Sequence, residues 1–187
     1  MKKTKILSGV LTLAMVAAMA VPTFAADITT DGGNSSVPVE LTAEAATFSV
    51  TVPTALPIDV AADGTVTVAN DVYIVNNSHG AVKVTNMTIA GADGWTIVDW
   101  DSANMAAEKV GATKVAMTIN TDKTTGADAI TFTEANFPKM DGANDGDTDQ
   151  MLITYDAKVP AQATELTDLT VANVVFTVGW DTEVVAP

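Results

Sequence analysis

Short runs in which apolar and polar residues alternate dominate this chain from residue 47 onward. Residues 48–52 (FSVTV) show the pattern, and Pro53 ends the run because proline has no backbone N–H to offer a β-ladder. Comparable runs recur at intervals of roughly 8–12 residues, which is typical of all-β domains. They lie at residues 58–60, 65–68, 72–75, 82–89, 94–100, 115–119, 130–132, 151–155 and 171–180. We therefore predict an all-β domain over residues 47–181, in which two antiparallel sheets pack as a sandwich of Greek-key or jelly-roll type.

The segments between these runs carry turn residues rather than long helices. Residues 62–65 (ADGT) predict a tight turn, and residues 76–80 (NNSHG) predict a hairpin connection because Asn and Gly tolerate positive φ. The one helix that the sequence favours covers residues 101–109 and is barely two turns long, with Asp101 or Ser102 as its cap. Without long amphipathic helices between the strands, a parallel α/β plan is excluded.

The first 25 residues have the layout of an export signal. Lys2, Lys3 and Lys5 form a basic start, and an apolar run of about 16 residues follows them. Small residues around Ala25 favour cleavage after that position. The alternative is an uncleaved anchor helix, but the run is shorter than the roughly 20 residues that span a bilayer. We therefore expect a secreted protein whose mature chain begins at Ala26.

Residues 26–46 form a predicted lead-in of small and polar residues before the domain. The lead-in contains one short alternation of apolar residues, at Val37, Val39 and Leu41. Because these side chains share one face of an extended strand, the segment is a candidate donor strand. Residues 182–187 are expected to form a short tail.

The charge of the chain limits the kinds of partner it can have. The whole chain has a formal net charge of −14, and removal of residues 1–25 leaves six lysines against 23 acidic residues, or −17. Such a field repels nucleic acid and anionic membranes, so we expect neither as a partner and no membrane span after processing. The chain has no cysteine, so disulfides and thiolate chemistry are excluded and stability must come from the hydrophobic core.

Few residues of the chain suit catalysis. Its single histidine, His79, follows Ser78 in a loop where adjacent side chains point apart, and no Gly-x-Ser-x-Gly sequence is present. A solvated loop histidine is the favoured interpretation. Paired carboxylates remain available to a hydrolase, although the abundance of acidic residues makes that observation uninformative. We expect a protein that is not an enzyme.

One acidic loop of the chain is a candidate calcium site. Asp145, Asp147 and Asp149 alternate, and Asp156 falls eleven residues after Asp145, as in a loop with oxygen ligands at positions 1, 3, 5 and 12. Gln150 stands where such a loop needs glycine, and the strand predicted next would carry Asp156 away. An irregular calcium site and a merely solvated acidic loop are both left open.

Three tryptophans bear on carbohydrate binding, because sugar rings stack on exposed indoles. Trp95 and Trp100 are five residues apart, so in a regular strand they point to opposite faces and one of them belongs to the core. Trp180 has the parity of the inward-facing residues of its strand. Core packing is expected for at least two of the three, and Trp100 is the candidate glycan contact.

Lys83 and Asn173 each lie on a predicted strand. Some extracellular β-domains contain an internal Lys–Asn amide bond, which also requires a buried acid beside the pair. The sequence does not locate such an acid, and chance coexistence of the two residues on strands is the other interpretation.

Three strand sequences resemble those of small secreted β-sandwich proteins of Gram-positive surfaces. They are residues 72–77 (VYIVNN), residues 94–97 (GWTI), similar to a Trp-x-Leu signature with Ile for Leu, and residues 175–180 (VFTVGW). This group includes the WxL cell-wall-binding domains and the TasA/camelysin biofilm-fibre proteins. The likeness to WxL domains implies non-covalent wall attachment involving the regions of Trp95 and Trp180, although a second Trp-x-Leu is absent. The likeness to the fibre proteins implies polymerisation by strand donation from the segment that contains Val37, Val39 and Leu41.

These observations favour a secreted, non-enzymatic surface or extracellular-matrix protein with a structural or adhesive role. The expected partners are a cell-wall component, another surface protein or a second copy of the chain. The alternatives are a carbohydrate-binding module and a carboxylate-dependent hydrolase. Calcium is the only cofactor for which the sequence offers a candidate site.

Overall fold

The computed structural model describes residues 31, 39, 41–143 and 146–182, apart from the side chain of Asp147. The predicted signal peptide and most of the predicted lead-in therefore lie outside the described residues. The chain divides into two compact units, Met1–Ala43 and Glu44–Pro187. The strands among the described residues belong to the second unit.

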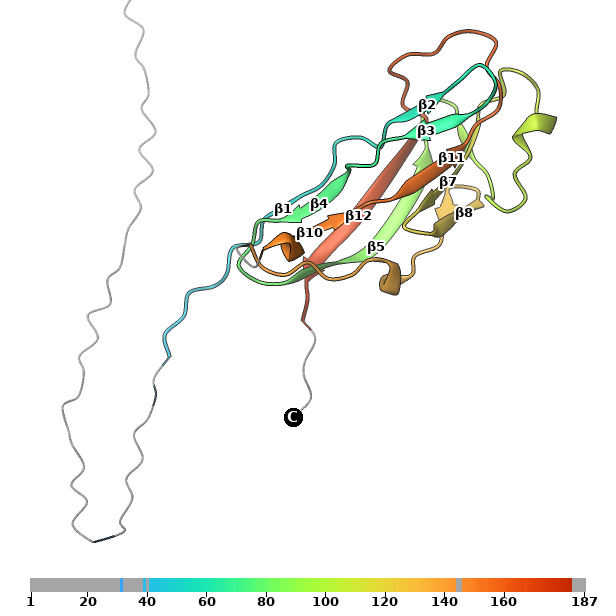
Figure 1. Ribbon diagram of the computed structural model, residues 1–187. Helices are drawn as coiled ribbons and strands as arrows, with labels where there is room; N and C mark the ends of the chain where they lie inside the picture. The colour runs from blue at the N-terminus through green and yellow to red at the C-terminus, as the bar shows by residue number, and fades with distance from the viewer. Residues whose placement is uncertain (1–30, 32–38, 40, 144–145, 183–187) are drawn as a thin grey trace, which may run out of the picture. The chain divides into compact units, whose positions relative to one another are not determined.

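The second unit is built almost entirely from strands, as the alternating pattern predicts (Figure 1). The strands among the described residues are β1 (Val50–Thr51), β2 (Ile58–Val60), β3 (Val66–Val68), β4 (Tyr73–Asn76), β5 (Val82–Gly91), β6 (Thr96–Ile97), β7 (Lys114–Ile119), β8 (Asp122–Gly126), β9 (Ala129–Ile130), β10 (Gln150–Leu152), β11 (Tyr155–Lys158) and β12 (Ala172–Trp180). The connections contain single turns of 3-10 helix at η1 (Met105–Ala107), η2 (Glu134–Asn136) and η3 (Asp147–Asp149). The predicted all-β class is confirmed.

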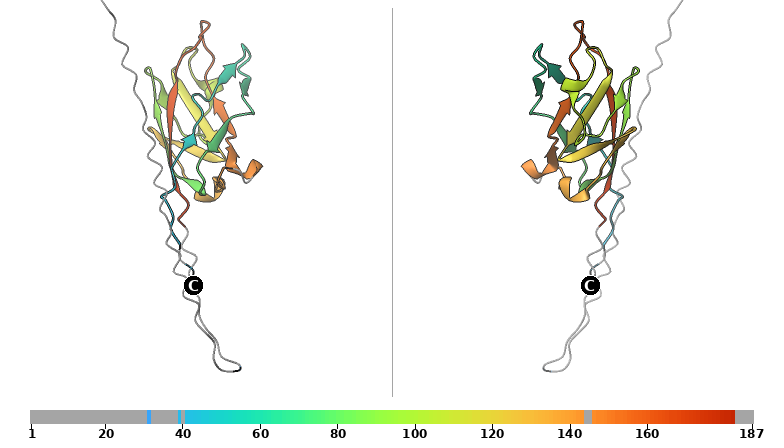
Figure 2. Two further views of the ribbon diagram at one scale, coloured as in Figure 1. Left: turned by 90° about the vertical axis from the view of Figure 1, so that its left-hand side faces the viewer. Right: turned by 90° about the vertical axis from the view of Figure 1, so that its right-hand side faces the viewer.

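The strands form several sheets, nearly all of them antiparallel. β4 lies between β1 and β10 in one sheet, whereas β11, β7, β8 and β9 follow one another in a second sheet, with β6 parallel to β7. β12 pairs with β5, and β2 pairs with β3 in a hairpin closed at the predicted turn. Views from two sides show the strands arranged around one interior, consistent with a β-sandwich (Figure 2).

The run that ends at Tyr155, predicted as one strand, is divided between two sheets, so that prediction is wrong. β10 pairs with β4, whereas β11 pairs with β7. At the change of sheet, Asn120 Oδ1 accepts hydrogen bonds from the N–H (2.8 Å) and the hydroxyl (3.2 Å) of Thr154. Met151, Ile153 and Tyr155 are all buried. The alternation of buried and exposed side chains continues from β10 into β11. The hydrophobic pattern of the sequence therefore does not reveal the change of sheet.

The Asn-rich loop between β4 and β5 is not a hairpin, because its flanking strands belong to different sheets. Asn76 is fully buried, and its side-chain amide donates to the carbonyls of Gly80 (2.8 Å) and Asp141 (2.7 Å). The buried hydroxyl of Ser78 accepts from the N–H of Ser49 (2.8 Å) and donates to the Ser49 carbonyl (3.1 Å). These side-chain hydrogen bonds hold a crossing between sheets, where a hairpin was predicted.

The predicted helix at residues 101–109 is reduced to the single turn of η1. None of the η1 residues is buried, so packing gives so short a helix no support. The carboxylate of Asp99 accepts from the N–H of Ser102 (2.7 Å), which fixes a turn rather than a helix cap.

The hydrophobic pattern does not predict β8, because its sequence, DKTTG, is mostly polar. It joins β7 through a two-residue turn at Asn120 and Thr121, whose φ angles are 45° and 72°. A two-residue turn in which both residues have positive φ is a type I′ hairpin turn, for which Asn-Gly is the preferred sequence. Thr121 is β-branched, and for such a residue this conformation is strained.

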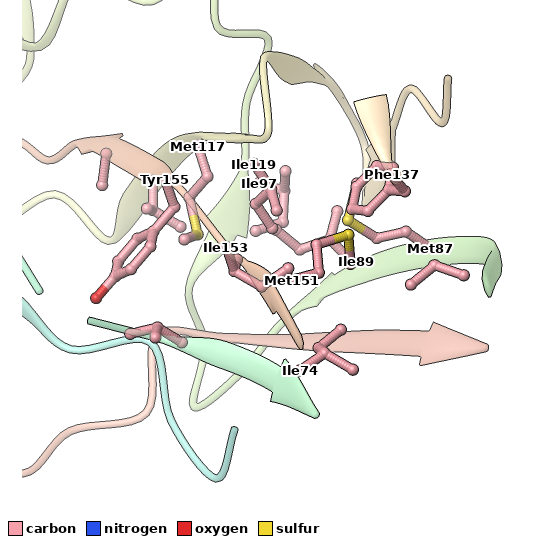
Figure 3. Close-up of a cluster of buried hydrophobic side chains, with 14 of the residues drawn as sticks. Ile74, Met87, Ile89, Ile97, Met117, Ile119, Phe137, Met151, Ile153 and Tyr155 are labelled. Carbon is pink, nitrogen blue, oxygen red and sulfur yellow. The ribbon is translucent and has the colours of Figure 1, made fainter. Parts of the chain in front are cut away.

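Buried side chains from both sides of the unit meet in one core (Figure 3). Ile74 from β4 faces the side chains of Met151 and Ile153 (Figure 3). Tyr155 and Phe137 lie at opposite ends of the cluster in this view. The remaining buried members include Val82, Val84, Met87, Ile89, Trp95, Ile97, Val115, Met117, Ile119 and Met140. This core has no disulfide to support it, since the chain contains no cysteine.

Tyr155 connects the β2–β3 hairpin to the core. Its hydroxyl donates to the carbonyl of Pro57 (2.6 Å) and accepts from the N–H of Ala69 (3.2 Å). Burial raises the pKa of Tyr155 above its ordinary value of 10.0, because the phenolate is poorly solvated there. The neutral form is therefore favoured in the folded state. The stability that this pKa shift contributes is complete below pH about 10, where Tyr155 is neutral in both the folded and the unfolded chain. It is lost as the pH rises through the raised pKa of the folded state.

We predict that Tyr155→Phe lowers the free energy of unfolding by about 1–3 kcal/mol at neutral pH, because Pro57 and Ala69 lose their partner. Urea unfolding at neutral pH and above pH about 10 measures both effects, and the alkaline loss of stability should be smaller in the variant. Tyr73→Phe, at a tyrosine that is 38% exposed, is the control and should change stability little. Unchanged stability of Tyr155→Phe would contradict this role.

We predict that Thr121→Gly raises the free energy of unfolding by about 1 kcal/mol, because glycine adopts positive φ without strain. Thermal and urea unfolding provide the measurement. The control is Thr125→Gly within β8, where φ is not positive, and it should lower stability by roughly 0.5–1 kcal/mol. A destabilised Thr121→Gly variant would show that strain at this turn is not significant.

Candidate functional site

β12 is a nine-residue strand with an open edge. Its one partner among the described residues is β5, which lies beside it along its whole length (Figure 1). The other side of β5 is covered, since β6 and β9 pack against it and Val82 forms a bridge with Met140. An open edge leaves a row of backbone N–H and C=O groups available to another strand.

Hydrogen bonds at both ends of β12 show which residues face β5. The carbonyl of Val171 accepts from the N–H of Ala92 (3.1 Å), and the N–H of Asp181 donates to the carbonyl of Ala81 (2.9 Å). In an antiparallel ladder the N–H and C=O of one residue point to the same side, and successive residues alternate. The extra residue of the β-bulge lies in β5, at Thr85, so this alternation is kept along β12. Odd-numbered residues of β12 therefore face β5, and even-numbered residues face the open side.

The even-numbered residues also carry the apolar side chains that pack toward the core. Val174, Phe176 and Val178 contact the core but are only partly buried. The ring of Phe176 lies 6.4 Å from that of Phe137, measured between centroids. A strand added to this edge would pair with the open backbone groups and cover these side chains.

An aromatic pair marks the C-terminal end of this edge. The rings of Trp180 and Phe48 meet edge to face, with centroids 5.1 Å apart and an interplanar angle of 84°. Gly80 lies against the indole, and a Cβ at that position would be 2.9 Å from Cζ3 of Trp180. Trp180 thus packs against the core, in keeping with its inward parity.

The candidate donor segment is highly exposed where it is described. Val39 is 96% exposed and Leu41 is 87% exposed. Val37, the third apolar residue of the alternation, lies outside the described residues. Both side chains are therefore available for burial against another surface.

Only part of the candidate calcium loop lies within the described residues. Asp149 ends η3, whereas Asp145 and the side chain of Asp147 lie outside the described residues. Asp156 lies on β11, where its carboxylate accepts from the N–H of Ala157 (2.7 Å). No group of three or more possible ligands occurs among the described His, Cys, Asp and Glu residues.

The tryptophans differ in burial as their spacing predicts. Trp95 is 7% exposed and belongs to the core, whereas Trp100 is partly buried. The Lys158 ammonium lies 4.2 Å from the centroid of the Trp100 ring and donates a hydrogen bond to the Trp100 carbonyl (2.7 Å). This cation–π contact occupies one face of the indole, so a sugar would have to use the other face or displace Lys158.

The side chains of Ser78 and His79 lie in different surroundings. His79 is exposed, whereas the hydroxyl of Ser78 is buried and bonded to the backbone of Ser49. The backbone N–H groups of Thr65 and Ser102 hold the pKa values of Asp63 and Asp99, respectively, below the usual range. These two carboxylates therefore serve as acceptors in surface turns.

The strand register rules out the Lys83–Asn173 amide bond that was one interpretation of the sequence, and it favours chance coexistence of the two residues on strands. Lys83 pairs with Gly179, whereas Asn173 pairs with Ala90. Six residues of strand separate the two positions, which is about 20 Å at roughly 3.3 Å per residue.

The described residues contain no helix with the length and apolar character needed to cross a membrane. Comparison of the chain with protein-family models, with curated proteins and with solved structures finds no match.

The alternation along β12 predicts different effects for proline at neighbouring positions. Val175→Pro removes an N–H that faces β5 and should lower the free energy of unfolding by about 1–3 kcal/mol beyond any packing loss. Val174→Pro removes an N–H on the open side and should cost only the packing of its partly buried side chain, which Val174→Ala measures separately. Urea unfolding of the mature protein compares the three variants. Equal losses in the two proline variants would contradict the assignment of the open edge.

Proposed function

We propose that this chain is a secreted, non-enzymatic structural protein of the cell surface or extracellular matrix that self-assembles by strand donation. In this proposal the segment with Val37, Val39 and Leu41 of one copy adds to the open edge of β12 in the next copy. The observation that carries the proposal is the nine-residue edge of β12, with β5 as its one described partner.

The chemistry of the two elements supports their pairing. Main-chain hydrogen bonds supply affinity in strand addition, and alternate side chains supply specificity. Val39 and Leu41 are almost fully exposed, and burial of such a side chain contributes about 1.5–3 kcal/mol. The donor side chains would lie beside Val174 and Phe176, which are apolar and only partly buried.

The charge of the chain restricts how copies approach one another. Mature copies with a formal net charge of −17 repel each other at long range, and salt screens this repulsion beyond about 8–10 Å. Contacts at the β12 edge are short-range and mostly apolar, so they act after the repulsion has been screened. Assembly is therefore favoured by physiological ionic strength and opposed by low salt.

Wall attachment through an exposed Trp-x-Leu-like site receives less support. The Trp95 side chain is 7% exposed, and the Trp180 indole packs against Phe48. A wall component that binds this protein would therefore meet another surface, or would bind the assembled form.

Size-exclusion chromatography with light scattering on mature protein, residues 26–187, tests the proposal at physiological ionic strength. We expect concentration-dependent oligomers for the wild type and a shift toward monomer for Leu41→Asp, because a buried unpaired charge is strongly unfavourable. Thr42→Asp introduces the same charge on the opposite face of the donor strand and is the matched control, expected to assemble nearly as well as the wild type.

Two outcomes would contradict the proposal. One is a wild-type protein that stays monomeric at every concentration and ionic strength. The other is a set of oligomers that Leu41→Asp and deletion of residues 26–46 leave unchanged.

A further inference from the structure

Lys83, Glu134 and Asp181 form a close cluster at the C-terminal end of β12. The Lys83 Nζ lies 2.6 Å from Glu134 Oε1 and 3.7 Å from Asp181 Oδ1. The three side chains line a hollow together with Ala135, Phe137, Pro138 and Lys139. An amine therefore lies between two carboxyl groups.

The fold fixes the positions of these three residues. Lys83 on β5 pairs with Gly179 on β12, and Asp181 follows two residues later, so its side chain lies on the same face as Lys83. The N–H of Asp181 donates to the carbonyl of Ala81 (2.9 Å), which holds the backbone of Asp181 beside β5. Glu134 belongs to η2, which packs against β5.

The burial of the cluster decreases from Asp181 to Glu134. The side chains of Asp181, Lys83 and Glu134 are 11%, 23% and 61% exposed. Asp181 Oδ1 is buried without a hydrogen-bond partner among the described residues. A buried carboxyl oxygen of this kind is uncommon and unfavourable, whereas conversion of the carboxyl group to an amide would remove its charge.

We propose that Lys83 and Asp181 form an internal amide bond, with Glu134 as the group that moves the protons. One proton of the Lys83 ammonium passes to Glu134 Oε1, and the free amine attacks Cγ of Asp181. Glu134 then passes this proton, followed by a second proton from the attacking nitrogen, to one carboxyl oxygen of Asp181, which leaves as water. One C–N bond forms, one C–O bond breaks and one water is released, with no oxidant or reductant needed. Proximity of this kind makes such a step effectively unimolecular.

The bond would link β5 to the residue that follows β12 by one position. It would therefore fix the C-terminal end of β12 in a chain that has no cysteine for a disulfide. A covalent closure of a long loop stabilises a fold by restricting the unfolded chain. This inference is independent of the proposed strand donation, because the bond is internal to one copy.

Intact-mass spectrometry of the unfolded mature protein tests the inference. We expect a mass lower by one water molecule than the mass of the mature sequence. Fragmentation after proteolysis should identify one branched peptide that joins Lys83 to Asp181. The Lys83→Arg variant keeps the positive charge but should have the full sequence mass, and so should Glu134→Gln when circular dichroism shows that it is folded.

The controls separate this bond from other losses of water. Asp-Gly sequences can lose water as succinimides, and fragmentation would place that loss at one of their aspartates instead. The mature chain has five such aspartates: Asp31, Asp63, Asp93, Asp141 and Asp145. Lys139→Arg changes the other lysine of the hollow and should leave the branched peptide in place. Wild-type protein with the full sequence mass, or with water loss confined to the aspartates of Asp-Gly sequences, would overturn the inference. A folded Glu134→Gln variant that still contains the branched peptide would overturn the role of Glu134.

Discussion

The pairing of β12 with β5 is the interaction on which the rest of this structure depends. β12 is the last described strand in sequence, and its even-numbered side chains pack against a core built by most of the earlier strands. Its odd-numbered residues satisfy their backbone groups on β5, which leaves the even-numbered ones facing the open side. The edge of the sandwich therefore lies beside partly covered apolar side chains, and natural sheets usually protect such an edge.

Buried polar side chains determine where the chain crosses between sheets. Asn76 and Asn120 each bond to a backbone group of a distant segment at two such crossings, Asn76 to Asp141 and Asn120 to Thr154. Buried Asp122 similarly accepts from the N–H of Thr133 (2.7 Å) and the side-chain amide of Asn136 (2.9 Å). Because an unpaired partner in these networks would be costly, they favour this one set of connections over alternatives of similar hydrophobic pattern.

Local patterns in the sequence were sufficient to predict the fold class and most strands. The alternation at residues 171–180 and the turn at residues 62–65 are local signals, and each corresponds to an observed element. The sheet change after Leu152 keeps the apolar period, so pattern alone does not reveal it. β8 has too few apolar residues to stand out, and it is held by turns and by the buried hydroxyl of Thr124 instead.

The candidate site was only partly predictable for the same reason. The donor segment is identified by its own alternation, but an open edge depends on which strands pair, and pairing is a long-range property. The Lys83–Glu134–Asp181 cluster likewise depends on the register between β5 and β12 and on the position of η2. The sequence offered only Asn173, on another predicted strand, as a possible partner of Lys83, and the register places it far from Lys83.

Amide hydrogen exchange followed by NMR tests the central claim, that β12 is an open edge, most directly. The account predicts rapid exchange at the N–H groups of Val174, Phe176 and Val178 in a monomeric Leu41→Asp protein, with Val175 and Thr177 protected. In the assembled wild type the same three groups should become protected as well. Protection of all five groups in the monomer would contradict the account, because the edge would then already be covered within one copy.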